Sequence, residues 1–89
     1  MSRVQGSPEI LAQIAEQIKK VIHGLEHTIN SLSTAYRIAG NGWNDSKYIQ
    51  LGEAVNQAIR AMKSPVPDLQ VAIQKIKKME ADLLAYLAS

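Results

Sequence analysis

The stretch Gly40-Asn41-Gly42-Trp43-Asn44-Asp45 separates two long segments in which apolar residues recur with helical spacing. Two glycines and two asparagines within six residues supply backbone freedom and easy access to positive φ, so we expect a helix to stop here and the chain to turn. Asp45 or Asn44 can cap the next helix, because either side chain accepts from the unpaired N–H groups of a first turn. The stretch predicts the corner of a helical hairpin, with Trp43, the only tryptophan, at its tip.

Length and composition indicate a single domain over residues 1–89. The chain is 46% hydrophobic and 20% charged and has no phenylalanine, so its core must be aliphatic. A net charge of +2 is too small to favour nucleic acid as a partner. No cysteine is present, which excludes disulfides and thiol catalysis. Nothing in this composition calls for a cofactor.

The N-terminal residues and the apolar runs bear on localisation. Residues 1–7 have no apolar core of the kind that a signal peptide needs, and no apolar run approaches membrane-spanning length. We therefore expect no stable membrane insertion. If the protein leaves its cell, we expect it to do so without a cleaved signal peptide.

The first arm is predicted to be helical from about residue 8 to residue 39. Ser7-Pro8-Glu9 is typical of a helix start, with a hydroxyl cap, proline at the first helical position and an acid in the first turn. The apolar residues fall into three heptad rows. The first row is Leu11, Ile18, Leu25, Leu32 and Ala39; the second row is Ile14, Val21, Thr28 and Ala35; the third row is Ala15, Ile22, Ile29 and Tyr36.

The second arm, about residues 46–87, repeats this pattern. Its first row is Tyr48, Val55, Met62, Leu69, Ile76 and Leu83; its second row is Leu51, Ala58, Pro65, Ala72, Met79 and Tyr86; its third row is Gly52, Ile59, Val66, Ile73, Glu80 and Leu87. Pro65 and Pro67 predict a break or kink at residues 64–67, with Ser64 able to cap a new helix. Because the heptad rows run through the prolines without a slip, a kinked second arm is favoured over a compact three-helix bundle.

An apolar face three rows wide is too broad for one neighbouring helix to cover. About a third of each face would stay exposed in a lone hairpin, more than a monomer usually carries. We therefore predict that two antiparallel hairpins pair into a four-helix bundle. Gly24, Ser31 and Gly52 would allow close approach of the helices. The predicted partner face comprises Leu11, Ile18, Ile22, Leu25, Ile29, Leu32, Tyr36, Val55, Ile59, Met62, Leu69, Ile73, Ile76 and Leu83.

His23-Gly24-Leu25-Glu26-His27 spells the H-x-x-E-H pattern of one group of zinc peptidases. Histidines four residues apart face the same way on a helix. Both lie on polar rows, however, and the chain has no third histidine. We interpret them as surface residues, and we expect neither a metal site nor an enzyme, since no nucleophile has an identifiable base beside it.

Trp43-Asn44-Asp45-Ser46-Lys47-Tyr48, followed by Leu51, is similar to the Trp-x-Gly turn and helix start of the WXG-type, early-secreted-antigen-like small proteins of bacterial type VII secretion. Asp45 stands where that family has glycine, and Tyr86 lacks the acid four residues later that belongs to the family's export signal. The predicted turn motif is Gly42, Trp43, Asp45 and Tyr48.

The resemblance implies a non-catalytic protein of the bacterial cytoplasm that is exported, or that accompanies an exported protein. It would form a homodimer, or a heterodimer with a related hairpin or a larger secreted effector, and contact the secretion machinery. The alternative is an intracellular helical adaptor or regulatory subunit that docks a partner helix.

Overall fold

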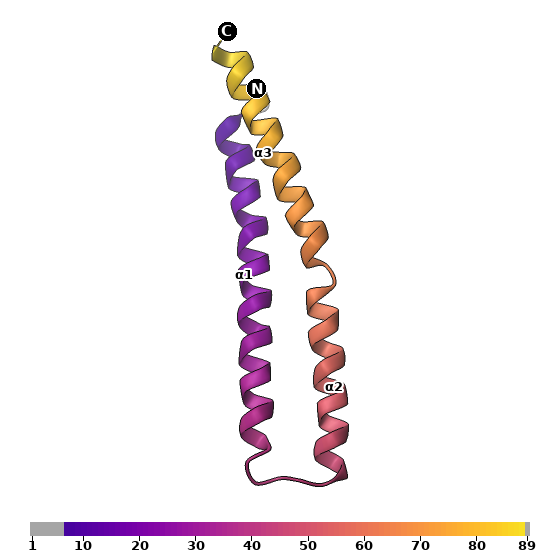
Figure 1. Ribbon diagram of the computed structural model, residues 1–89. Helices are drawn as coiled ribbons and strands as arrows, with labels where there is room; N and C mark the ends of the chain where they lie inside the picture. The colour runs from indigo at the N-terminus through magenta and orange to yellow at the C-terminus, as the bar shows by residue number, and fades with distance from the viewer. Residues whose placement is uncertain (1–6, 89) are drawn as a thin grey trace, which may run out of the picture. The chain divides into compact units, whose positions relative to one another are not determined.

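Residues 7–88 are described by the computed structural model, and they form three α-helices without any strand. The helices are α1 (Pro8–Ala39), α2 (Ser46–Lys63) and α3 (Val66–Ala88) (Figure 1). The predicted all-α class is confirmed, and α1 has the bounds predicted for the first arm. The chain divides into two compact units. Unit 1 combines Met1–Ile22 with Pro67–Ser89, and unit 2 is His23–Val66.

The start of α1 differs in detail from the predicted cap. Pro8 is the first helical residue, as expected, and the Ser7 carbonyl accepts from the Leu11 N–H at 3.1 Å. The Ser7 hydroxyl, however, donates to Glu9 Oε1 at 2.8 Å instead of accepting from a backbone N–H. This hydrogen bond lowers the pKa of the Glu9 carboxyl, because it stabilises the charged form. The serine thus fixes the acid that faces the positive end of the helix.

Unit 2 is a helical hairpin made of residues 23–39 of α1, the turn 40–45 and α2. The two helical segments run antiparallel on either side of the turn (Figure 1). Asp45 has extended backbone angles (φ −133°, ψ −173°), and its Oδ1 accepts from the N–H groups of Lys47 at 3.0 Å and Tyr48 at 3.2 Å. The predicted capping of α2 is therefore confirmed, with Asp45 rather than Asn44 as the cap.

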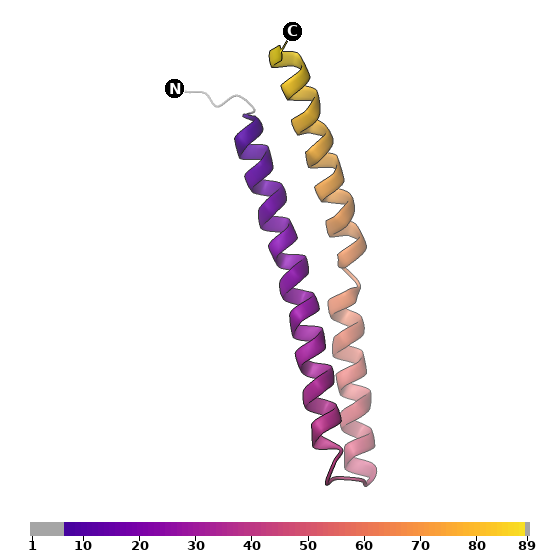
Figure 2. The same ribbon diagram turned by 60° about the vertical axis from the view of Figure 1, so that its left-hand side comes forward.

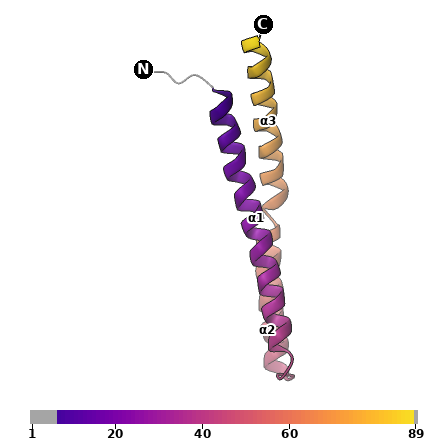
Figure 3. The ribbon, with the colours of Figure 1, turned by 90° about the vertical axis from the view of Figure 1, so that its left-hand side faces the viewer.

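Unit 1 pairs the beginning of α1 with α3, again antiparallel. Figure 2 and Figure 3 show α3 alongside the first part of α1, with the C-terminal end of α3 extending past the first turn of α1. The buried apolar residues of this unit are Ala15 and Ile22 from α1 and Ile73 from α3, with exposed fractions of 5%, 5% and 7%. Small and branched aliphatic side chains therefore form the contact, as the absence of phenylalanine requires.

The break between α2 and α3 lies at Ser64 and Pro65, slightly shorter than the predicted 64–67. Ser64 has helical backbone angles (φ −55°, ψ −43°), and its N–H donates to the Arg60 carbonyl at 3.0 Å. It therefore ends α2 and does not cap α3, contrary to the prediction. The physical reason is that Ser64 still has a carbonyl within reach, whereas Pro65 has no N–H to continue the ladder. Pro67 lies in the first turn of α3, where a missing N–H removes no helical bond.

The three apolar rows differ in how far their side chains are buried. Every described first-row and third-row residue is buried or half-buried, except Leu87 at the end of α3. The second row is exposed, except for Leu51 and Ala72, which are half-buried. At about 100° per residue, the first and third rows are about 40° apart on a helix, whereas the first and second are about 60° apart. The narrower stripe faces the neighbouring helix, so the first and third rows form the seam of each unit.

Candidate interaction surface

Two tyrosines join the arms of the unit 2 hairpin. Tyr36 of α1 and Tyr48 of α2 stack with ring centroids 4.4 Å apart and an interplanar angle of 2°. The Tyr48 hydroxyl donates to the Tyr36 carbonyl at 2.9 Å, and the Tyr36 hydroxyl donates to the Tyr48 carbonyl at 3.3 Å. Stacking brings apolar contact, and the reciprocal bonds satisfy both phenols. This tyrosine pair fixes which residues of the two helices lie opposite one another.

Each phenol lies over a glycine of the opposite segment. A Cβ added at Gly52 would meet the Tyr36 hydroxyl and would lie 2.9 Å from its Cζ. A Cβ added at Gly40 would meet the Tyr48 hydroxyl and would lie 2.7 Å from its Cζ. Both glycines are therefore needed for space. The positive φ expected of the turn glycines is absent from the described residues, so that prediction was wrong.

The sequence carries a signal for this arrangement that the heptad rows do not reveal. Tyr36 precedes Gly40 by four residues, and Tyr48 precedes Gly52 by four residues. Residues four apart share a face of a helix, so each helix offers one phenol and one gap on the same side. In an antiparallel pair, the phenol of each helix can fill the gap of the other. The sequence-based prediction instead places Tyr36 on a partner face and Gly52 at an intermolecular approach.

Trp43 lies beside the tyrosine pair and remains partly exposed. Its ring centroid is 6.0 Å from that of Tyr48, with an interplanar angle of 53°, and 40% of the residue is exposed. Gly42, next to it, is exposed, and an added Cβ there would have nothing within 4 Å. Among the predicted turn-motif residues, Trp43, Asp45 and Tyr48 therefore converge on the start of α2. Gly42 makes no close contact of this kind.

The tyrosine pair predicts a sensitivity to alkaline pH. Partial burial, with a smaller contribution from the hydrogen bond to Tyr36, raises the pKa of the Tyr48 phenol above its ordinary value of 10.0. The unfolded chain then loses this proton first, so the stability that Tyr48 contributes is complete below about pH 10 and falls as pH rises through the folded-state pKa. Urea unfolding measured across this range should show the decline, and Tyr48→Phe should make it shallower. An identical decline in the variant would contradict this role.

The fourteen residues predicted as a partner face are all buried or half-buried in the single chain. They belong to the first and third rows, which face the neighbouring helix within each unit. Gly52 is covered by Tyr36, whereas Gly24 and Ser31 are exposed. The residues that the seam leaves exposed are therefore the ones accessible to another molecule.

The second row is one apolar surface that unit 1 leaves open; Val71, Leu84 and Leu87 of α3 are also exposed but lie outside this row. Its large members are 44% to 75% exposed: Ile14 and Val21 on α1, and Met79 and Tyr86 on α3. In both helices, each second-row residue follows a first-row residue by three positions, and the two helices run antiparallel. Two antiparallel helices are related by a local two-fold axis perpendicular to the plane that contains them. This rotation exchanges the helices but not the two faces of the plane, so the two second rows lie on the same face of unit 1. Ile10, 45% exposed, lies next to them on α1.

The second row in unit 2 is made of smaller residues. Thr28 and Ala35 on α1 and Ala58 on α2 are exposed, and Leu51 is half-buried. Ile38, 59% exposed, borders the row at the end of α1. Unit 2 therefore offers a flatter surface than unit 1, with small side chains where unit 1 has isoleucine, valine, methionine and tyrosine.

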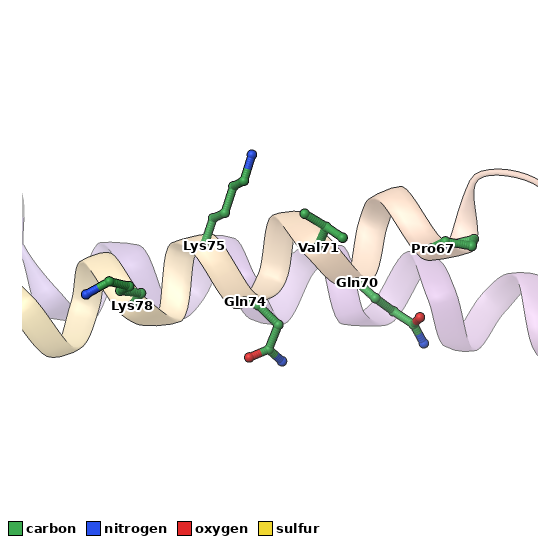
Figure 4. A pocket seen from close by; sticks show the side chains of 6 residues that line it. All are labelled: Pro67, Gln70, Val71, Gln74, Lys75 and Lys78. Atoms are coloured by element: carbon green, nitrogen blue, oxygen red, sulfur yellow. The ribbon is translucent and has the colours of Figure 1, made fainter.

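A shallow hollow lies on the surface of α3. The hollow in Figure 4 is lined by Pro67, Gln70, Val71, Gln74, Lys75 and Lys78. All six come from α3, and Figure 4 shows Lys75 pointing away from Gln70 and Gln74.

Residues 7–88 contain no group of three or more metal-binding side chains, and the His23 and His27 side chains are exposed. The ion pairs Lys19–Glu16 (3.9 Å) and Lys78–Asp82 (3.2 Å) are exposed and contribute little stability.

The fold and its open face define a class: an all-α protein with a tyrosine-paired helical hairpin and an uncovered apolar row. Compared with family models, curated proteins and solved structures, the chain gave no match. Within residues 7–88, no helix combines the length and the apolar character required to cross a bilayer. The features that bear on function are thus the open second row and the Trp43 corner.

Proposed function

We propose that this chain is a small non-catalytic partner protein that pairs with another helical hairpin through its second row, forming a four-helix bundle. We further propose that it serves as a substrate or export partner of a bacterial type VII secretion system. In this role it would leave the cytoplasm alone or with a larger secreted effector.

The imbalance between buried and exposed apolar residues carries the proposal. Four apolar residues of the described chain are buried, Ala15, Ile22, Val55 and Ile73, whereas eleven large ones are at least 40% exposed. Among residues 7–88, no side chain is exposed by less than 2%. Burying one large aliphatic side chain completely is worth about 1.5–3 kcal/mol, so covering several half-exposed ones offsets a substantial part of the cost of association. A second helical surface is the simplest cover for a helical apolar row.

The secretion part of the proposal rests on the corner. Trp43 is held beside Tyr48 and still exposes 40% of its surface, so it can both support the hairpin and contact another protein. Tryptophan is enriched at the energetic centres of protein interfaces. The resemblance of this corner to the WXG-type turn is what points to secretion machinery among the proteins that could read it.

Export can be tested with a tagged chain in a bacterium that has a type VII secretion ATPase. We expect the protein in the culture supernatant, its loss when the ATPase is deleted, and a strong reduction by Trp43→Ala. Ile49→Ala is a matched control, because Ile49 is 64% exposed in the same unit and lies outside the corner. Circular dichroism checks that both variants keep their helix content.

Retention in cells with an active ATPase would contradict export. Recovery of a cytoplasmic partner with the retained protein would then favour the helical-adaptor alternative. Reduced export of both variants to the same degree would remove Trp43 from the proposed recognition.

A further inference from the structure

We infer that the second row of α3 is a self-association surface whose partner is α3 of a second copy, antiparallel and centred on Met79. The inference rests on the proposed function and specifies the partner and the contacting residues. It uses only residues of α3 in unit 1, where the second row contributes Ala72, Met79 and Tyr86 at heptad spacing.

The sizes of these side chains are self-complementary. Met79 is 55% exposed and Tyr86 is 75% exposed, whereas Ala72 is half-buried and small. In a two-fold antiparallel pairing centred on Met79, a residue seven positions before the centre lies opposite the residue seven positions after it. Tyr86 of each copy then covers Ala72 of the other, and the two Met79 side chains meet at the axis. Such large-on-small packing fills space without leaving voids.

The charges along the edge of the row agree with the same register. Lys75 and Asp82 occupy the heptad position next to the second row, on the side away from the seam. In a pairing centred on Met79, Lys75 of one copy lies opposite residue 83 of the other copy, next to Asp82. The two-fold symmetry creates this Lys75–Asp82 proximity twice. Opposite charges at such flanking positions set partner choice and orientation in paired helices.

Lys75 is available for this role. It has no ion pair within the described chain, its side chain is exposed, and Figure 4 shows it pointing away from Gln70 and Gln74. Asp82 already accepts from Lys78 of its own helix at 3.2 and 3.3 Å, and a carboxylate has capacity for a second cation. A different partner would need the same alternation of large and small side chains and the same order of basic and acidic residues along one helix. A second copy of this chain has both.

Cysteine cross-linking tests the register directly, because the natural chain contains no cysteine. With Met79→Cys, we expect a disulfide-linked dimer to form readily under mild oxidation, since the two thiols meet at the axis. Lys77→Cys, on the same helix but away from the row, is the control and should cross-link far less. A mixture of Ala72→Cys and Tyr86→Cys chains should cross-link as a heterodimer, while Ala72→Cys alone should not.

Charge reversal tests the same contact in solution by sedimentation. Lys75→Glu should weaken self-association about tenfold by placing two acids together, and adding Asp82→Lys should restore it. Lys77→Glu makes the same charge change away from the row and should have little effect. Helix content from circular dichroism must be unchanged in every variant.

A monomer at all concentrations, or a dimer that Met79→Cys does not cross-link, would overturn the inference. Failure of the proposed function looks different. A chain that pairs with a related hairpin but not with itself refutes the α3 contact alone, whereas a chain that binds no hairpin and stays in the cell refutes the proposed function.

Discussion

Replacing Tyr48 with alanine is expected to lower the free energy of unfolding by about 3 kcal/mol, the lower part of the range for removing a large aromatic side chain. The substitution removes the stack on Tyr36, the hydrogen bond to the Tyr36 carbonyl and the cover over Gly40. It also removes the ring beside Trp43. Because a chain of this size has a small core, such a loss is a large share of its stability. Urea unfolding followed by circular dichroism measures it.

Two further variants separate the contributions. Tyr48→Phe keeps the ring and removes the hydroxyl, so its cost should be about 1 kcal/mol, that of one hydrogen bond. A double-mutant cycle with Tyr36→Ala should give a coupling of about 0.5–1.5 kcal/mol, as for other aromatic pairs. Costs that simply add, with no coupling, would show that the two rings act independently.

The features that local chemistry determines could be predicted from the sequence. The bounds of α1 follow from Pro8 and from the turn stretch, and the start of α2 follows from the Asp45 cap. The three heptad rows follow from the spacing of apolar residues. Each of these depends on neighbours within a few positions along the chain, so no knowledge of the opposite helix is needed.

The features that depend on the opposite helix could not be predicted in the same way. Which two rows form the seam, and hence which row is left open, depends on how the arms pair. The tyrosine pair depends on the register that places Tyr36 opposite Gly52 and Tyr48 opposite Gly40. The predicted partner face consists of residues that the neighbouring helix of the same chain covers, because periodicity alone does not say which side of a broad stripe that helix takes.

Alanine at Gly52 and alanine at Gly24 should have opposite effects on stability, although both glycines lie inside helices. In a helix interior, glycine to alanine normally stabilises by about 0.5–1 kcal/mol, because it reduces the freedom of the unfolded chain. At Gly24 an added Cβ has nothing within 4 Å, so we expect this gain. At Gly52 the added Cβ meets the Tyr36 phenol, and we expect a net loss of about 1–2 kcal/mol, typical of overpacking.

The sign at Gly52 is decided by how firmly Tyr36 is held. A free phenol at the end of a side chain would move aside at little cost, but this ring is stacked on Tyr48 and its hydroxyl donates to the Tyr48 carbonyl. Moving it away from the new methyl group disturbs both contacts. Tyr36→Phe removes the hydroxyl that the Cβ meets first, so Gly52→Ala should cost less in that background than in the natural chain. Equal stabilisation by Gly52→Ala and Gly24→Ala in urea unfolding would show that the phenol yields freely and that the tyrosine pair does not set the register of the hairpin.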